Sequence, residues 1–228
     1  MKNSPTKISA VHVLLALTIL TAGAAAGSPM RQAASGPAVK IECVTVFTSA
    51  TGGVKAGAIT AWETPSGERG ELSVDGLQSI ILAPSAKKAV YLLEPTTKQA
   101  QIVSGTSASY RQMFPDGPSQ PLMHQRRLPP VNFLGYRCSV REGVESSNGS
   151  QRHVQIWEAL INGKREQLRL CSRGDNGSVQ LVEAISVRVY PQTPPGLLVV
   201  PPGYTITPLN IAKAQKAASP SMPVGEAR

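Results

Sequence analysis

Short apolar runs rich in β-branched residues alternate with turn-forming segments along most of this 228-residue chain. The turn segments contain Pro, Gly, Asn and Asp, which favour tight loops because they fix φ or tolerate a positive φ. No stretch of ten or more residues has a convincing helical period; only 107–113 and 211–218 suit short helices. This spacing predicts a mainly β fold, an antiparallel meander with little helix. The predicted strands span 56–62, 71–74, 77–83, 88–94 and 98–104, then 136–143, 152–157, 165–174 and 178–191.

Four of the turn segments carry specific hairpin signals. Asp75-Gly76, Asn148-Gly149, Asn162-Gly163 and Asn176-Gly177 each place a residue that tolerates positive φ before a glycine. Such pairs favour tight hairpins between neighbouring antiparallel strands. We therefore expect these strands to pair with their sequence neighbours.

A proline-rich stretch separates the two groups of predicted strands. Residues 114–130 contain five prolines. Because proline lacks a backbone N–H, it disrupts both helices and sheet ladders. We expect residues 104–131 to form a connector that is neither regular element.

The N-terminus has the pattern of a secretory signal peptide. Two lysines precede an apolar stretch from Ile8 to Leu20, and small residues follow with A-x-A sites after Ala24 or Ala26. An uncleaved anchor is the alternative, but the apolar stretch is short of the ~20 residues that span a bilayer. We expect 1–26 to be removed and the protein to be periplasmic or secreted. A flexible linker (27–38), one β domain (39–207) and a disordered tail (208–228) then follow.

The charge balance is basic but scattered. The formal net charge is +9, and loss of Lys2 and Lys7 with the signal peptide leaves +7. Lys87-Lys88, Arg126-Arg127 and Lys164-Arg165 are the only adjacent pairs, and aromatic residues make up 4% of the chain. Nucleic-acid binding needs a basic stripe with stacking aromatics, so it is not expected.

The chain offers few residues for metal binding or catalysis. His124 lies in the proline-rich stretch and His153 at the start of a predicted strand, and neither has a second ligand at metal-binding spacing. No nucleophile motif and no phosphate-binding glycine loop is present. We expect no cofactor, no metal and no catalytic residue. A hydrolase that brings either histidine to a serine and an acid stays as a minor alternative.

Three cysteines enter an oxidising compartment if the chain is exported. One disulfide is then expected, with one thiol left over. Cys138 with Cys171 is one pairing, although an intervening strand would separate the two in a plain meander. Cys43 with either of the others is the alternative.

The last long predicted strand alternates imperfectly. Val179, Leu181, Ile185 and Val187 share one parity, but Glu183 interrupts it. Either a β-bulge resets the alternation or a carboxylate points inward, and the bulge is the commoner device.

Residues 189–208, "VYPQTPPGLLVVPPGYTITP", place six prolines around one apolar run. Prolines at 191, 194 and 195 should end the preceding strand. Leu197 to Val200 can then plug an end of the sheet, while Tyr204 and Ile206 continue along its edge. We call residues 189–208 the latch, since it would cover an edge that could otherwise pair with another chain.

The latch and the strands before it resemble the outer-membrane lipoprotein carrier and sorting superfamily over residues 40–206. Trp157 lies in a tryptophan-containing strand, "GYRC" resembles that superfamily's strand opening, and "LLVVPPGY" resembles its ending. Residues 76–103 are similar to its paired hairpins. The resemblance implies a single curved antiparallel sheet, a half-barrel. Carriers of this type close their hollow with helices, and this chain departs from them in lacking strong helices.

On this basis we expect an exported, non-catalytic envelope protein that binds a lipid, a lipoprotein or another apolar ligand on the concave face. Such concave apolar surfaces are favoured ligand sites. The alternative is an interaction or structural protein that binds a protein or an anionic polymer through loops and basic surface. The residues expected to line or close the ligand face are Leu77, Ile80, Tyr91, Trp157, Val187, Leu198 and Tyr204.

Overall fold

The structure is a computed structural model that describes residues 36–87, 89–104, 122–147 and 150–209. Twelve strands form a single sheet that does not close. The first group is β1 (Ala38–Thr48), β2 (Val54–Thr64), β3 (Gly67–Val74), β4 (Leu77–Pro84), β5 (Ala89–Glu94) and β6 (Gln99–Ser104). The second is β7 (Met123–Phe133), β8 (Tyr136–Ser147), β9 (Ser150–Ile161), β10 (Lys164–Gly174), β11 (Val179–Tyr190) and β12 (Thr205–Pro208). A short 3-10 turn, η1 (Ser85–Lys87), precedes β5.

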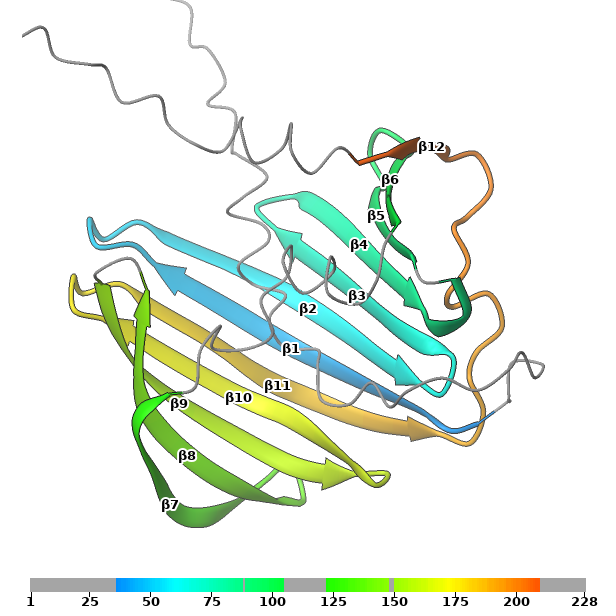
Figure 1. Ribbon diagram of the computed structural model, residues 1–228. Coiled ribbons are helices and arrows are strands. Elements are labelled where there is room, and N and C mark those ends of the chain that lie inside the picture. Colours follow the sequence, from blue (N-terminus) through cyan, green and yellow to red (C-terminus); the bar gives the residue numbers. More distant parts are fainter. Residues whose placement is uncertain (1–35, 88, 105–121, 148–149, 210–228) are drawn as a thin grey trace, which may run out of the picture.

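The strand order is two meanders joined by one seam. β1 to β6 and β7 to β11 each follow the order of the chain, and β1 pairs with β11 between them. Both ends of the sheet curl away from this seam, β7 and β8 at one end and β5, β6 and β12 at the other (Figure 1). The predicted mainly β half-barrel with little helix is therefore confirmed.

One pair departs from the antiparallel pattern. β12 lies parallel to β6, with Ile206 opposite Ala100. The reason is that the latch returns from the end of β11 to the outer edge of the sheet instead of turning in a hairpin (Figure 1).

The hairpin signals at Asp75-Gly76 and Asn162-Gly163 are confirmed, because both residues of each pair have a positive φ. Asp75-Gly76 has φ values of 50° and 77°, and Asn162-Gly163 has 51° and 80°. Positive φ at both central residues is the type I′ geometry that matches the twist of the flanking strands. Leu134-Gly135 makes a similar turn between β7 and β8, with φ values of 50° and 80°.

We expected residues 104–131 to form neither a helix nor a strand, and this prediction is wrong for residues 123–131. β7 runs from Met123 to Phe133 and contains Pro129 and Pro130. β7 is an edge strand that pairs only with β8, and its register shifts between Leu128 and Val131. Both prolines fall in this irregularity, where no ladder N–H is needed. Residues 105–121, including the expected 107–113 helix, lie outside the described residues, as does 211–218.

The predicted β-bulge is confirmed, and it lies at Ile185, two residues after Glu183. Glu42 lies opposite Ser186 but Cys43 lies opposite Ala184, so Ile185 is the extra residue of β11. Val182 and Ala184 are buried before the bulge, and Val187 packs against the core after it. Glu183 therefore lies on the other face, so the alternative of an inward carboxylate is not needed.

Paired side chains define two faces of the sheet. We call the face that carries Val39, Ile41 and Cys43 the core face, because these residues belong to the largest buried cluster. Lys40 lies on the opposite face, and the register places Trp62, Arg69 and Leu82 there with it. We call this the latch face, since part of the latch packs on it.

Candidate functional site

The core face carries a continuous row of apolar side chains across six strands. Leu72, Ile59, Cys43 and Ala184 lie directly opposite one another on β3, β2, β1 and β11. Val182, two residues before Ala184 on β11, continues the row. Leu170 on β10 lies opposite Val182, and Ile156 on β9 lies opposite Leu170. All seven residues are buried. Within the structure these side chains are therefore part of the hydrophobic core.

The middle of the core face has small side chains. Ala61 lies between Ile41 on β1 and Gly70 on β3, and Cys43 faces Ala184 across the seam. Because small side chains extend less far from the backbone, the layer of side chains along this strip is thinner than on a face rich in Leu or Phe. The low aromatic content of the chain agrees with this thin layer.

A second apolar cluster lies on the latch face at the β4–β6 end. It consists of Leu82, Tyr91, Leu93 and Ala100, with Val200 and Tyr204 of the latch packed against it. Arg69 Nη1 donates to the carbonyl oxygen of Leu197 at 3.1 Å, and this bond fixes the latch on the sheet. The predicted plug is thus confirmed for Val200, whereas the side chain of Val199 is 61% exposed. Tyr204, expected to continue along the edge, packs on the same cluster.

The seven residues expected to line one ligand face do not share a face. Leu77 and Val187 lie on the core face, where Val187 packs against the core and Leu77 is exposed. Ile80 and Tyr91 lie on the latch face, and Tyr204 packs on the same cluster. Leu77 and Ile80 are an odd number of positions apart on one strand, so they point to opposite sides. Leu198 is half-buried within the latch.

Trp157 packs against the largest buried cluster at the far end of the sheet and is surrounded by protein groups. The Phe133 ring meets it edge-on with centroids 5.5 Å apart, and Arg169 Cζ lies 4.6 Å from its ring centroid. Trp157 Nε1 donates to Gln155 Oε1 at 3.0 Å, and Arg169 Nε donates to Glu183 at 2.7 Å. These contacts give Trp157 a packing role in β7–β11.

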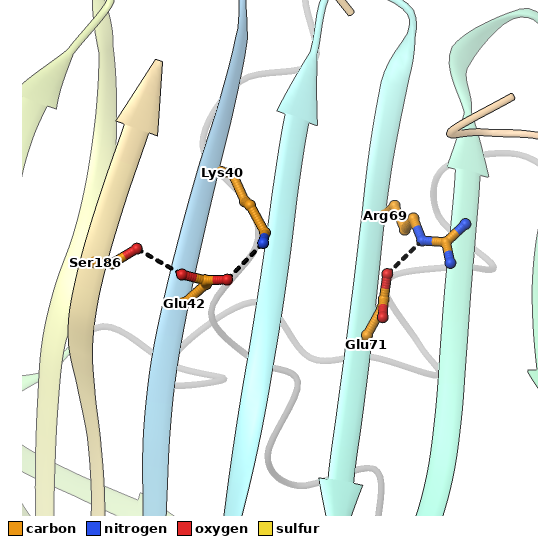
Figure 2. A network of polar contacts seen from close by, with 5 residues as sticks. All are labelled: Lys40, Glu42, Arg69, Glu71 and Ser186. Carbon is orange, nitrogen blue, oxygen red and sulfur yellow. Dashed lines mark hydrogen bonds and ion pairs between the residues drawn. The ribbon is translucent and has the colours of Figure 1, made fainter. Parts of the chain in front are cut away.

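The middle of the latch face is polar and its charges are paired. Figure 2 shows Glu42 between Lys40 and Ser186, whose hydroxyl donates at 2.7 Å, and Arg69 beside Glu71 at 2.8 Å. The hydrogen bond from Lys40, followed by that from Ser186, lowers the pKa of Glu42. Lys40 and Arg69 are thus each paired with a carboxylate, so this region is a polar surface.

A buried carboxyl group on β10 gave no signal in the sequence. Glu166 is 5% exposed and hydrogen-bonds Glu63, which is also ion-paired with Lys164. Burial first, and the hydrogen bond with Glu63 second, raise the pKa of Glu166. Glu166 Oε1 and Gln167 Nε2 are both buried without a partner among the described residues. This burial depends on β2, which lies about a hundred residues earlier, so local patterns could not indicate it.

The expected disulfide is absent from the structure, because all three cysteines are free. Cys138 and Cys171 lie on β8 and β10, with β9 between them, and they face Ala159 and Gln155 of β9. This offset of four residues along β9, added to two strand spacings, exceeds the reach of a disulfide. Cys43 is on the core face, whereas Cys171 pairs with Leu181 and therefore lies on the latch face.

The two described histidines are exposed on β7 and β9. Within the described ranges, no group of three or more His, Cys, Asp or Glu side chains is placed to hold a metal ion. No helix in the same part of the chain has the length and apolar character needed to cross a membrane.

Comparison with known proteins gives similarity to solved structures alone. No family model and no curated protein matches this chain. An uncharacterized conserved protein from Thermus thermophilus is 13% identical, with 77% of this chain and 92% of that chain covered and a TM-score of 0.46. A LolA superfamily protein from Nitrosomonas europaea is 7% identical, with 71% and 90% covered and a TM-score of 0.35.

A domain described as an outer membrane lipoprotein-sorting protein, from Vibrio parahaemolyticus, is 10% identical, with 71% and 88% covered and a TM-score of 0.33. The superfamily that the sequence resembles is therefore among the structures similar to this chain.

Proposed function

We propose that this protein is an exported, non-catalytic binding protein that holds a lipid, a lipoprotein or another apolar ligand against the core face. The observation that carries the proposal is the apolar row from Leu72 on β3 to Ile156 on β9, on one side of an open sheet. The side chains of the row are at most 7% exposed, so an apolar ligand has to replace the protein groups that cover them.

The distribution of polar groups supports the core face over the latch face. The latch covers one end of the latch face, and the middle of that face carries the paired charges of Figure 2. Burying paired charges under a hydrocarbon chain is unfavourable because the charges lose water. The N-terminal signal pattern supports a periplasmic or secreted location.

Native mass spectrometry of the protein comprising residues 27–228, purified from periplasm without detergent, tests this proposal. We expect a reproducible additional mass of lipid size. A purified protein without added mass, which also fails to take up a fluorescent fatty acid, would contradict the proposal. The loops and the basic surface would then be the better candidates for binding.

A matched pair of variants locates the ligand on the sheet. Ala61→Leu adds bulk to the small-residue strip of the core face, and Ala58→Leu adds the same bulk at an exposed position of the latch face. We expect Ala61→Leu to weaken fatty-acid uptake at least several-fold and Ala58→Leu to leave it unchanged. Circular dichroism melting of both variants verifies that loss of uptake is not loss of folding. Equal uptake by both folded variants would place the ligand elsewhere.

A further inference from the structure

A cavity of about 370 Å³ lies at the β7–β10 end of the sheet, where its lining residue Arg141 pairs with Ile156 at the end of the core-face row. Its size is at the low end of the range for small-molecule sites. Strands β7, β8, β9 and β10 each contribute polar side chains to it. The lining residues are Gln125, Arg127, Ser139, Val140, Arg141, Glu158 and Arg165.

The lining of this cavity contains three guanidinium groups and a single carboxylate. Arg141 binds Glu158 with two hydrogen bonds, of 3.3 Å from Nε and 3.2 Å from Nη2. Arg165 Nη1 lies 4.0 Å from the same carboxylate, and its side chain is 68% exposed. Glu158 can neutralise one of these cations, so the lining as a whole carries an excess of positive charge.

Arg127 provides the unmatched charge. It lies directly opposite Arg141 in the β7–β8 ladder. Like charges at directly paired positions repel and destabilise the strand pair. Arg127 makes no hydrogen bond or ion pair with any other residue that the structure describes. The adjacent Arg126, by contrast, is ion-paired with the directly opposite Glu142.

We infer that this cavity binds a phosphate ester, with Arg127 as its principal ligand and Arg165 as a second. An oxyanion between these groups neutralises the excess charge and relieves the repulsion between Arg127 and Arg141. Guanidinium groups bind phosphate oxygens with two parallel hydrogen bonds, which favours arginine over lysine at such a site. The cavity is larger than a bare phosphate ion and accommodates the esterified group. The phosphate ester can be a soluble compound or a lipid headgroup, and the inference does not depend on the apolar ligand proposed above.

Isothermal titration of the protein comprising residues 27–228 tests the site with four probes. Glycerol 3-phosphate represents a soluble ester, with glycerol as its uncharged counterpart. Dihexanoyl phosphatidylglycerol represents an anionic headgroup, with dihexanoyl phosphatidylcholine as the zwitterionic counterpart, all below micelle-forming concentrations. We expect saturable binding of at least one of the two anionic probes and weaker binding of its counterpart.

The decisive comparison is between Arg127→Gln and Arg126→Gln. Both variants lose one positive charge on the same edge strand, but only Arg127 lines the cavity. We expect Arg127→Gln to weaken binding by about tenfold or more, as for loss of one charge-assisted hydrogen bond, and Arg126→Gln to change it little.

Binding of glycerol 3-phosphate with this pattern indicates a soluble ester, and binding of the anionic lipid alone indicates a headgroup. No binding of either anionic probe, or equal weakening by the two variants, would overturn the inference. Thermal melting of both variants verifies that they remain folded.

Discussion

Glu166 links the stability of the sheet to pH through a single buried carboxyl group. Burial and the hydrogen bond with Glu63 raise its pKa from an ordinary 4.5 to about 9. Between these two values the folded protein holds a proton on Glu166 that the unfolded chain has released. The folded state binds more protons, so the free energy of unfolding falls as the pH rises through this window.

The variant Glu166→Gln should remove this dependence, because an amide keeps the shape and cannot ionise. We expect the variant to become progressively more stable than the natural protein from pH 5 to pH 9, by at most about 1.4 kcal/mol per pH unit. Urea unfolding at pH 5, 7 and 9 measures this difference. A constant difference across these three pH values would contradict the assignment.

The free cysteines give a second prediction for single residues. Burial raises the pKa of Cys43 to about 12 and also raises that of Cys138, so neither forms a thiolate easily. We expect Ellman's reagent to find three thiols in denaturant, and Cys171 to react first in the folded protein because it is only half-buried. Cys171→Ser should remove the fast reaction. A single thiol in non-reducing denaturant would reveal a disulfide and contradict the structure.

Among the structural elements, the latch should stabilise the β4–β6 end through one side of its apolar run. Val200 packs against the cluster of Leu82 and Tyr91, whereas the neighbouring Val199 is exposed. We expect Val200→Ala to lower the free energy of unfolding by roughly 1 kcal/mol, from the loss of partly buried methyl groups. Val199→Ala should change it by less than about 0.5 kcal/mol. Denaturant unfolding compares the two variants, and equal effects would mean that the latch does not pack as described.

The prolines of β7 should protect the opposite edge of the sheet. Pro129 and Pro130 interrupt the row of N–H groups that an edge strand otherwise presents to another chain. We expect the double variant Pro129→Thr and Pro130→Thr to associate into dimers or larger species as its concentration rises. Size-exclusion chromatography with light scattering measures this, and unchanged behaviour at high concentration would assign edge protection to the shifts in β7 register alone.

For the whole molecule, the sequence predicts the local pairings better than the faces. Asp75-Gly76 and Asn162-Gly163 mark hairpins because the φ requirement is met by adjacent residues. The predicted strands omit β1, whose partner β11 lies at the other end of the domain. The ligand-face residues lie on different faces because Leu77 and Ile80 are an odd number of positions apart in β4. In β11 the bulge at Ile185 changes the alternation, and a shift of one residue moves the following side chains to the other face. The burial of Glu166 and the cavity around Arg127 depend on strands that meet only in the folded sheet.

The seam between β1 and β11 has a consequence for the order in which the chain can fold. Every other antiparallel pair joins strands that follow one another in the chain, so each meander can form from nearby segments. The seam joins Ala38 to Tyr190, so the chain between them has to close into a long loop before β1 and β11 can make stabilising contacts. The two halves of the core face therefore stay separate until almost the whole domain is present.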